Sequence, residues 1–245
     1  MESRVLRDDM VDSLEHESKG ILTSDAVGMA MRQVPREAFV SETAAAYADR
    51  SHREYGTTVL APSTVARLLQ AAAPEPGEST LVIGAGVGYT VAVVAELVGG
   101  RHVHAVDLSQ QLVQHARRNL SRAGYEDVLV VQGDGAAGLP AYGPYDCILV
   151  EAAVLEVPSS LRDQVREAGR IVVPQGGQVQ ELRTITDDGD RIDHGTIALN
   201  PLLVPGEESG AIERNRTRRE DREFAERAAT RRSGWEHSWI EWEER

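Results

Sequence analysis

The 245-residue chain is acidic, with 39 Asp and Glu residues against 26 Lys and Arg residues and a formal net charge of −13. Its 41% hydrophobic content is ordinary for a globular protein, and it has neither a run of about 18 apolar residues that could cross a membrane nor the apolar N-terminal stretch of a secretory signal. Cys147 is the only cysteine, which excludes an intramolecular disulfide and a cysteine-based metal cluster, so we expect a cytoplasmic protein with no metal site.

The N-terminal part of the chain is predicted to be mainly helical. Apolar residues recur at helical spacing within residues 1–40, where Ser24 is a helix cap and Pro35 ends the helix that follows. Residues 41–62 show little periodicity and are predicted to be a loop. A short helix over residues 63–73 then runs into a turn rich in proline and glycine.

From residue 80 onward, short apolar strands alternate with helices. This alternation predicts an α/β fold with a mostly parallel sheet and helices on both faces. Near the end of the sheet, an Asp-Asp-Gly-Asp turn at 187–190 joins two strand-like runs and predicts an antiparallel hairpin. We expect strands at 80–83, 102–107, 128–131, 145–150, 170–173, 178–185 and 191–199, and helices at 89–98 and 109–123, with a helix or loop at 159–167.

The composition changes after residue 206. Residues 207–245 contain eleven acids and nine arginines, which predicts a charged helical extension appended to a main domain at 1–206. All three tryptophans, at 235, 239 and 242, would share one face of such a helix. That face would pack on its own domain or join two copies, so we expect a monomer or a homodimer formed through the extension.

The basic residues of the chain are almost entirely arginine, because Lys19 is the only lysine. An acidic surface with almost no lysine is typical of a halophilic protein, since concentrated salt screens the repulsion between its carboxylates. A GC-rich genome would explain the lysine deficit but not the net charge. The negative charge also argues against a broad nucleic-acid-binding surface, which needs a basic face.

A glycine loop carries the first chemical signal. A predicted strand runs directly into Gly84-Ala85-Gly86-Val87-Gly88, and a helix begins at Tyr89. Glycines let a backbone turn sharply and approach a ligand closely, and a helix N-terminus offers free N–H groups. A dinucleotide-binding loop is the competing interpretation.

The spacing of the loop and two acids favour S-adenosylmethionine (AdoMet) over a dinucleotide. The spacing is G-x-G-x-G, and Asp107 and Asp134 follow the next two strands. In open α/β sheets, ligands lie at the carboxyl ends of the strands. Asp107 would therefore accept hydrogen bonds from the ribose, and Asp134 from the adenine amino group.

Several ordered motifs resemble the protein-L-isoaspartate O-methyltransferase family over about residues 9–205. The most specific is Val-Pro-Arg-Glu-Ala-Phe-Val at 34–40, ahead of a glycine loop that ends in Gly-Tyr. This resemblance implies a Rossmann-like, AdoMet-dependent enzyme that methylates the carboxylate of L-isoaspartyl residues in damaged proteins and peptides. Further matching motifs are Ala-Tyr-Ala-Asp-Arg at 46–50, Gly-Asp-Gly at 133–135, Pro-Tyr-Asp at 144–146 and Val-Pro at 173–174.

The resemblance also implies roles for individual residues. The family's Gly-Gln-Thr-Ile-Ser signature, or its Gly-Ala-Thr-Ile-Ser form, is Gly-Thr-Thr-Val-Leu at 56–60 here, so the position of the serine usually taken as catalytic is Leu60. Thr58 is a neighbouring hydroxyl, and these two residues are the catalytic candidates. The candidates for cofactor binding are Thr57, Thr58, Val59, Gly84, Ala85, Gly86, Gly88, Tyr89, Asp107, Leu108, Asp134 and Gly135.

Two departures from the family pattern leave alternatives open. Leu60 lacks the hydroxyl, and Glu151 places a negative charge where the family has threonine, beside an anionic acceptor. Glu151 could instead point away and pair with an arginine. The alternatives to the isoaspartyl enzyme are a methyltransferase with another acceptor, such as tRNA or a small molecule, and a weakly active or non-enzymatic AdoMet-binding paralogue.

Overall fold

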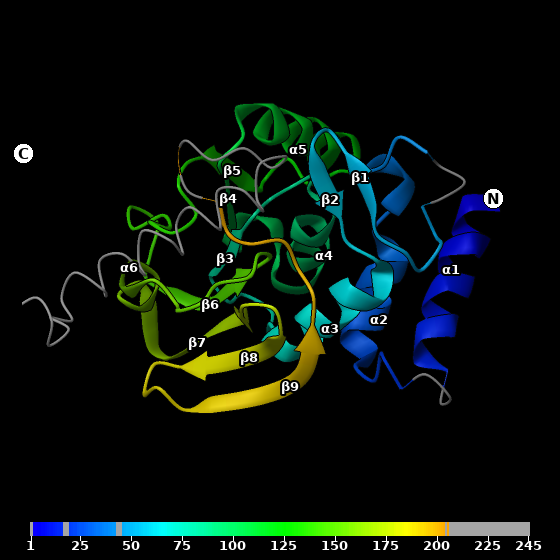
Figure 1. The fold of residues 1–245 in the computed structure, drawn as a ribbon. Coiled ribbons are helices and arrows are strands. Elements are labelled where there is room, and N and C mark those ends of the chain that lie inside the picture. The colour runs from blue at the N-terminus through cyan, green and yellow to red at the C-terminus, as the bar shows by residue number, and fades with distance from the viewer. Residues whose placement is uncertain (1, 17–19, 43–45, 204, 206–245) are drawn as a thin grey trace, which may run out of the picture. The chain divides into compact units, whose positions relative to one another are not determined.

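The computed structural model describes residues 2–16, 20–42, 46–203 and 205. Within these residues the main element is a seven-stranded sheet with the order β5-β4-β3-β6-β7-β8-β9 (Figure 1). The first five strands in this order are parallel, and β8 and β9 extend the sheet with antiparallel pairing, which confirms the predicted fold class. The strands are β3 (Thr80–Ile83), β4 (Val103–Asp107), β5 (Leu129–Gln132), β6 (Tyr145–Val150), β7 (Val165–Gly176), β8 (Gln180–Thr186) and β9 (Arg191–Ile197).

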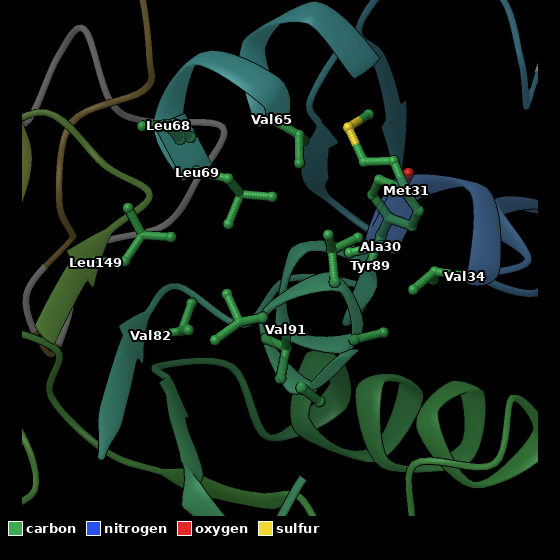
Figure 2. Packing of buried hydrophobic residues seen from close by; sticks show 14 of the residues in the cluster. Ala30, Met31, Val34, Val65, Leu68, Leu69, Val82, Tyr89, Val91 and Leu149 are labelled. Carbon is green, nitrogen blue, oxygen red and sulfur yellow. The ribbon is translucent and has the colours of Figure 1, made fainter. Parts of the chain in front are cut away.

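The two faces of the sheet are covered differently. On one face, Val82 and Leu149 pack with side chains of the larger helices (Figure 2). On the other face, Ile83 and Ile148 belong to a second buried cluster with apolar residues of segment 152–157 and a four-residue helix. The helices are α1 (Glu2–Glu15), α2 (Asp25–Gln33), α3 (Pro62–Ala72), α4 (Tyr89–Val98), α5 (Gln110–Arg122) and α6 (Ser159–Arg162), with 3-10 turns η1 (Arg36–Ala38) and η3 (Gly100–His102).

The strand order places a topological switch point between β3 and β6. The chain passes from β3 to β4 and β5 on one side and then returns to place β6 and β7 on the other side. Ligands of open α/β sheets bind beyond the carboxyl ends of the strands at such a point. The residues that follow these two strand ends are Gly84 and Glu151.

The prediction of a loop over residues 41–62 is wrong, because this segment contains a β-hairpin. Strands β1 (His52–Glu54) and β2 (Thr57–Val59) pair antiparallel around a two-residue turn. Tyr55 and Gly56 form this turn with φ angles of 48° and 81°. Glu54 is buried and accepts hydrogen bonds from the backbone N–H and hydroxyl of Ser41. Three-residue strands held by such tertiary contacts carry no apolar alternation that a sequence could reveal.

Other boundaries also differ from the prediction. Ser24 does cap α2, and Val34 ends that helix before Pro35 as predicted, but residues 20–24 between α1 and α2 are not helical. Strand β7 is longer than expected and takes up part of the segment 159–167, because it pairs with β6 on one side and with β8 on the other. No helix among the residues placed by the structure is long and apolar enough to span a membrane. The predicted extension at 207–245, with its tryptophan face, lies outside the described residues.

An arginine on β7 ties the sheet to the end of α3. The Arg170 guanidinium contacts both carboxylate oxygens of Glu78, at 3.0 and 2.6 Å, and donates to the backbone carbonyls of Ala72 and Ala73. The side chains of Arg170 and Glu78 are only 18% and 20% exposed. Removal of the arginine would therefore leave a partly buried carboxylate and two carbonyls without their partner.

We expect Arg170→Ala to lower the free energy of unfolding by about 2–3 kcal/mol, because breaking a mostly buried ion pair is costly. Urea denaturation measures this loss. Arg166→Ala is the matched control, since Arg166 pairs with Asp146 but is 47% exposed, and it should cost less than about 1 kcal/mol. Equal losses in the two variants would contradict the role given to Arg170.

Candidate active site

The glycine loop leaves β3 in a backbone conformation that residues other than glycine rarely adopt. Gly84, Gly86 and Gly88 have φ angles of 92°, 52° and 95°. The N–H groups of Gly84 and Ala85 both donate to the carbonyl of Val106 on β4, at 2.8 and 3.1 Å. The loop is therefore fixed to the neighbouring strand and presents its backbone at the switch point.

The end of the loop packs tightly against α5. A Cβ added at Gly88 would lie 3.3 Å from the Cα of Ala116, so the loop and this helix approach each other at backbone distance. Tyr89 begins α4, and its ring is buried. The candidates Gly84, Ala85, Gly86 and Gly88 thus form one turn held against β4 and α5, and Tyr89 follows it at the start of α4.

Asp107 ends β4 and lies directly beside the loop. One carboxylate oxygen accepts from the N–H of Gly86 and the other from the N–H of Ser109, both at 2.9 Å. Burial raises the pKa of Asp107, and these two N–H bonds oppose the rise. Each carboxylate oxygen can accept more than one hydrogen bond, so Asp107 retains acceptor capacity for the hydroxyls of a ribose.

Asp134 and Gly135 follow β5 at the same edge of the sheet. The backbone N–H of Gly133 donates to the carbonyl of Asp107 at 3.0 Å, which ties this segment to the end of β4. Asp134 is half-buried and accepts from the N–H of Ala136. A Cβ at Gly135 would lie 2.6 Å from the side chain of Ile83, so the segment needs glycine to come this close to β3. Leu108, half-buried, follows Asp107.

A buried arginine joins the N-terminal helical region to the segments on either side of the hairpin. Arg36 is 1% exposed, and its guanidinium donates to the carbonyl of Leu60 at 2.6 Å and to that of Ala46 at 2.8 Å. Its central carbon lies 4.3 Å from the ring centroid of Tyr89. Arg36 thereby holds the Leu60 segment against the first residue of α4, next to the glycine loop.

The remaining candidates lie on β2. Val59 is buried in the core, whereas Thr57 and Thr58 are half-buried. The Thr58 hydroxyl accepts from the side-chain amide of Asn200 at 2.9 Å. The Asn200 carbonyl in turn accepts from the N–H of Ala153, just beyond β6. Sequence reasoning missed Asn200, because a single Asn after the last strand carries no recognisable signal.

Glu151 follows β6 and lies beside the start of the glycine loop. Its N–H donates to the carbonyl of Ile83 at 2.8 Å, and its Cβ would lie 3.5 Å from a Cβ at Gly84. Burial raises the pKa of its carboxyl to about 7, and the negative charge of Asp107 adds to this rise. A hydrogen bond from Thr90 and the positive charge of Arg36 lower the pKa and oppose the rise. Among the described residues Glu151 has no arginine ion pair, and its Oε1 is buried without a hydrogen-bond partner.

The arrangement fits a ligand of the AdoMet type. A backbone cradle, a carboxylate beside it and a second carboxylate after the next strand meet at one edge of the sheet. The orphaned buried oxygen of Glu151 lies at the same place. In the part of the chain that the structure describes, no group of three or more His, Cys, Asp or Glu residues is placed to hold a metal ion.

Comparison with known protein families shows to which family the chain belongs. The model of the protein-L-isoaspartate(D-aspartate) O-methyltransferase family matches residues 6–205. The chain belongs to the protein-L-isoaspartate O-methyltransferase family.

Curated relatives support the same assignment. A protein-L-isoaspartate O-methyltransferase of Aeropyrum pernix is 43% identical over 189 residues, which cover 74% of this chain and 72% of the relative. The enzyme of the same name from Methanopyrus kandleri is 42% identical over 219 residues, covering 84% and 93% of the two chains.

Solved structures agree in fold. A protein-L-isoaspartate O-methyltransferase structure is 28% identical, with a TM-score of 0.71, and the match covers 86% of this chain and 69% of that one. A Plasmodium falciparum structure in complex with S-adenosyl-L-homocysteine is 22% identical, with a TM-score of 0.72 over 80% and 98% of the two chains, and supports the fold alone.

We expect Gly86→Val to weaken AdoMet binding at least about tenfold, because a branched side chain at a φ of 52° distorts the loop and crowds the ligand. Isothermal calorimetry measures the affinity. Gly189→Val is the matched control: it has a φ of 88° in the β8–β9 turn and an added Cβ meets nothing within 4 Å. It should show similar backbone strain in thermal melting but unchanged binding. Unaltered binding in a folded Gly86→Val variant would contradict the assignment of the loop.

Proposed function

We propose that this chain transfers the methyl group of AdoMet to the carboxylate of L-isoaspartyl residues in damaged proteins and peptides. The observation that carries the proposal is the position of Arg36, which belongs to the family-specific segment at 34–40. Its guanidinium connects the carbonyl of Leu60 with Tyr89 at the end of the glycine loop. The segments that the family resemblance assigns to the acceptor and to the cofactor thus meet at one arginine.

In this proposal, each half of the site has a defined task. The loop from Gly84 to Gly88 cradles the methionine part of AdoMet, Asp107 holds the ribose, and Asp134 holds the adenine. Residues 57–60 line the side from which the acceptor enters. AdoMet itself supplies an electrophilic methyl group on a sulfonium centre.

The chain has to position the acceptor rather than activate it. A carboxylate with a reference pKa near 4 is already ionised at neutral pH, so the transfer needs no general base. Catalysis then depends mainly on holding the carboxylate in line with the methyl group. The buried guanidinium of Arg36 donates to the carbonyl of Leu60, and a positive charge at this position favours an anionic acceptor. The Thr58 hydroxyl, held by Asn200, is a neighbouring polar group.

The experiment that tests the function is methyl transfer from labelled AdoMet to an isoaspartyl peptide and to its aspartyl twin. We expect incorporation into the isoaspartyl peptide and none into the twin. AdoMet binding without transfer to either peptide would support the non-enzymatic alternative. Transfer to tRNA or a small molecule in place of the peptide would support a different acceptor.

We expect Leu60→Ser to raise kcat/KM on the isoaspartyl peptide by about 2- to 10-fold, which corresponds to one positioning hydrogen bond worth about 0.5–1.5 kcal/mol. Steady-state kinetics of the peptide measures the change. Leu60→Ala is the matched control, because it removes the same apolar side chain without adding a hydroxyl. A gain of equal size in both variants would attribute the effect to space rather than to the hydroxyl.

We also propose that the protein works in a cytoplasm with concentrated salt. The supporting observations are its net charge of −13 and its single lysine. We expect the melting temperature to rise by about 5–10 °C from low to molar KCl, as salt screens repulsion between carboxylates. A neutral osmolyte at equal osmolality is the control. A flat melting temperature in KCl would contradict salt adaptation.

The domain organisation belongs to the same proposal. Residues 1–206 form the AdoMet-dependent methyltransferase domain, and residues 207–245 form a charged helical extension. The tryptophan spacing in the extension supports a monomer with the extension packed on its own domain, or a homodimer joined through it. The acidic composition supports the absence of a broad nucleic-acid-binding surface.

A further inference from the structure

Glu151 occupies the switch point of the sheet, directly between the two strands whose ends define the site. Leu149 of β6 is paired in register with Val82 of β3, and Glu151 lies two residues beyond Leu149, so its side chain leaves the sheet on the same face. Its backbone N–H donates to the carbonyl of Ile83, which fixes its position at the entrance of the glycine loop. The geometry of Glu151 is therefore set by the backbone of both strands.

The surroundings of the Glu151 carboxyl are charged on two sides. Asp107 acts on it from the end of β4, and Arg36 acts on it from η1. Thr90 on α4 provides a neutral hydrogen bond. Oε1 is nevertheless buried and has no hydrogen-bond partner among the described residues. An acid that is buried without such a partner is costly unless a ligand completes its surroundings.

AdoMet differs from its demethylated product, S-adenosylhomocysteine, in one charge. Both molecules carry an α-ammonium and a carboxylate, but only AdoMet carries the positive sulfonium. Glu151 lies between the glycine loop and the Arg36–Leu60 segment, which is where the methyl group would pass from cofactor to acceptor. A negative charge at this place acts on the sulfonium centre more directly than on the rest of the cofactor.

We propose that Glu151 is a cofactor-positioning residue whose carboxylate pairs electrostatically with the sulfonium, so that the chain binds AdoMet more tightly than S-adenosylhomocysteine. This inference rests on the proposed function and assigns a role to a residue where the family has threonine. It also accounts for the negative charge in an acceptor site for anions. The charge of Glu151 is balanced while AdoMet is bound, and once the methyl group has left, the neutral sulfur no longer holds the product.

The proposal has a consequence for protons. Without ligand, the raised pKa of about 7 means that Glu151 is partly protonated near neutral pH. A positive charge beside it favours the ionised form and lowers its pKa, so AdoMet binding releases a proton. The affinity for AdoMet should therefore increase as the pH rises through 7. The affinity for S-adenosylhomocysteine should not show this increase.

Isothermal calorimetry with AdoMet and with S-adenosylhomocysteine, at about pH 6 and about pH 8, tests the inference on the full chain. At the higher pH, we expect the wild type to prefer AdoMet over S-adenosylhomocysteine. This preference, measured as the ratio of the two dissociation constants, should be about tenfold larger in the wild type than in Glu151→Gln. Calorimetry in two buffers of different ionisation enthalpy should show proton release with AdoMet only. Glu126→Gln removes the same charge from an exposed turn before β5, at the opposite edge of the sheet, and should behave as the wild type.

The stability of the variant is checked in the same pH series. Because folding raises the pKa of Glu151 above its ordinary value of 4.5, its burial costs the ligand-free protein stability as the pH rises from that value through about 7. Glu151→Gln should therefore melt at a higher temperature than the wild type at about pH 8. The measurement of proton release uses the wild type and needs no variant.

Three results would overturn the inference. An equal loss of affinity for both ligands in Glu151→Gln would show that the carboxylate binds the α-ammonium group, which both ligands carry, and not the sulfonium. An unchanged ratio with unchanged affinities would show that Glu151 does not act on the cofactor, while methylation of the isoaspartyl peptide would leave the proposed function standing. Absence of binding by either ligand to the folded wild type would overturn the proposed function as well.

Discussion

The buried guanidinium of Arg36 is the interaction on which the arrangement of the site depends. It is a single cation, removed from water, that binds the carbonyls of Ala46 and Leu60 and lies over the ring of Tyr89. Burial lowers the pKa of Arg36, while the negative charges of Asp49 and Glu151 act in the opposite direction. Because removing the partners of a buried charge is costly, moving the Leu60 segment away from Tyr89 would destabilise this cation.

In the proposed function, the charges around this arginine suit a cationic cofactor and an anionic acceptor. Asp107 and Glu151 would face the ribose and the sulfonium, whereas Arg36, which holds the carbonyl of Leu60, would favour the acceptor carboxylate. The methyl group would then cross from a negative half of the site to a positive half. In a buried environment such a division has a larger effect than it would at a hydrated surface.

The two departures from the family pattern have different structural settings. Leu60 replaces a hydroxyl, but its backbone carbonyl is still held by Arg36, so the path of the chain at this position is preserved. Glu151 adds a charge at the switch point, where the backbone of β3 fixes its position. Under the roles proposed above, the first change removes a polar contact from the acceptor side, and the second adds one to the cofactor side.

The parallel sheet was predictable from sequence because its strands are short apolar runs separated by helices with clear caps. One such cap is Ser109, whose side chain accepts a hydrogen bond from the N–H of Leu112 at the start of α5. The glycine loop and the acids Asp107 and Asp134 were predictable for the same reason, since a parallel sheet brings the carboxyl ends of its strands to one edge. These features are local, and each is encoded by a few consecutive residues.

Tertiary structure alone decided the rest of the described site. The hairpin at 52–59 depends on contacts of Glu54 with Ser41, and its link to the segment after β9 depends on Asn200, which lies 142 residues from Thr58. The surroundings of Glu151 are set by Asp107 and Arg36, which come from separate elements. Burial and electrostatic surroundings arise from residues far apart in the chain, so no local pattern in the sequence could reveal them.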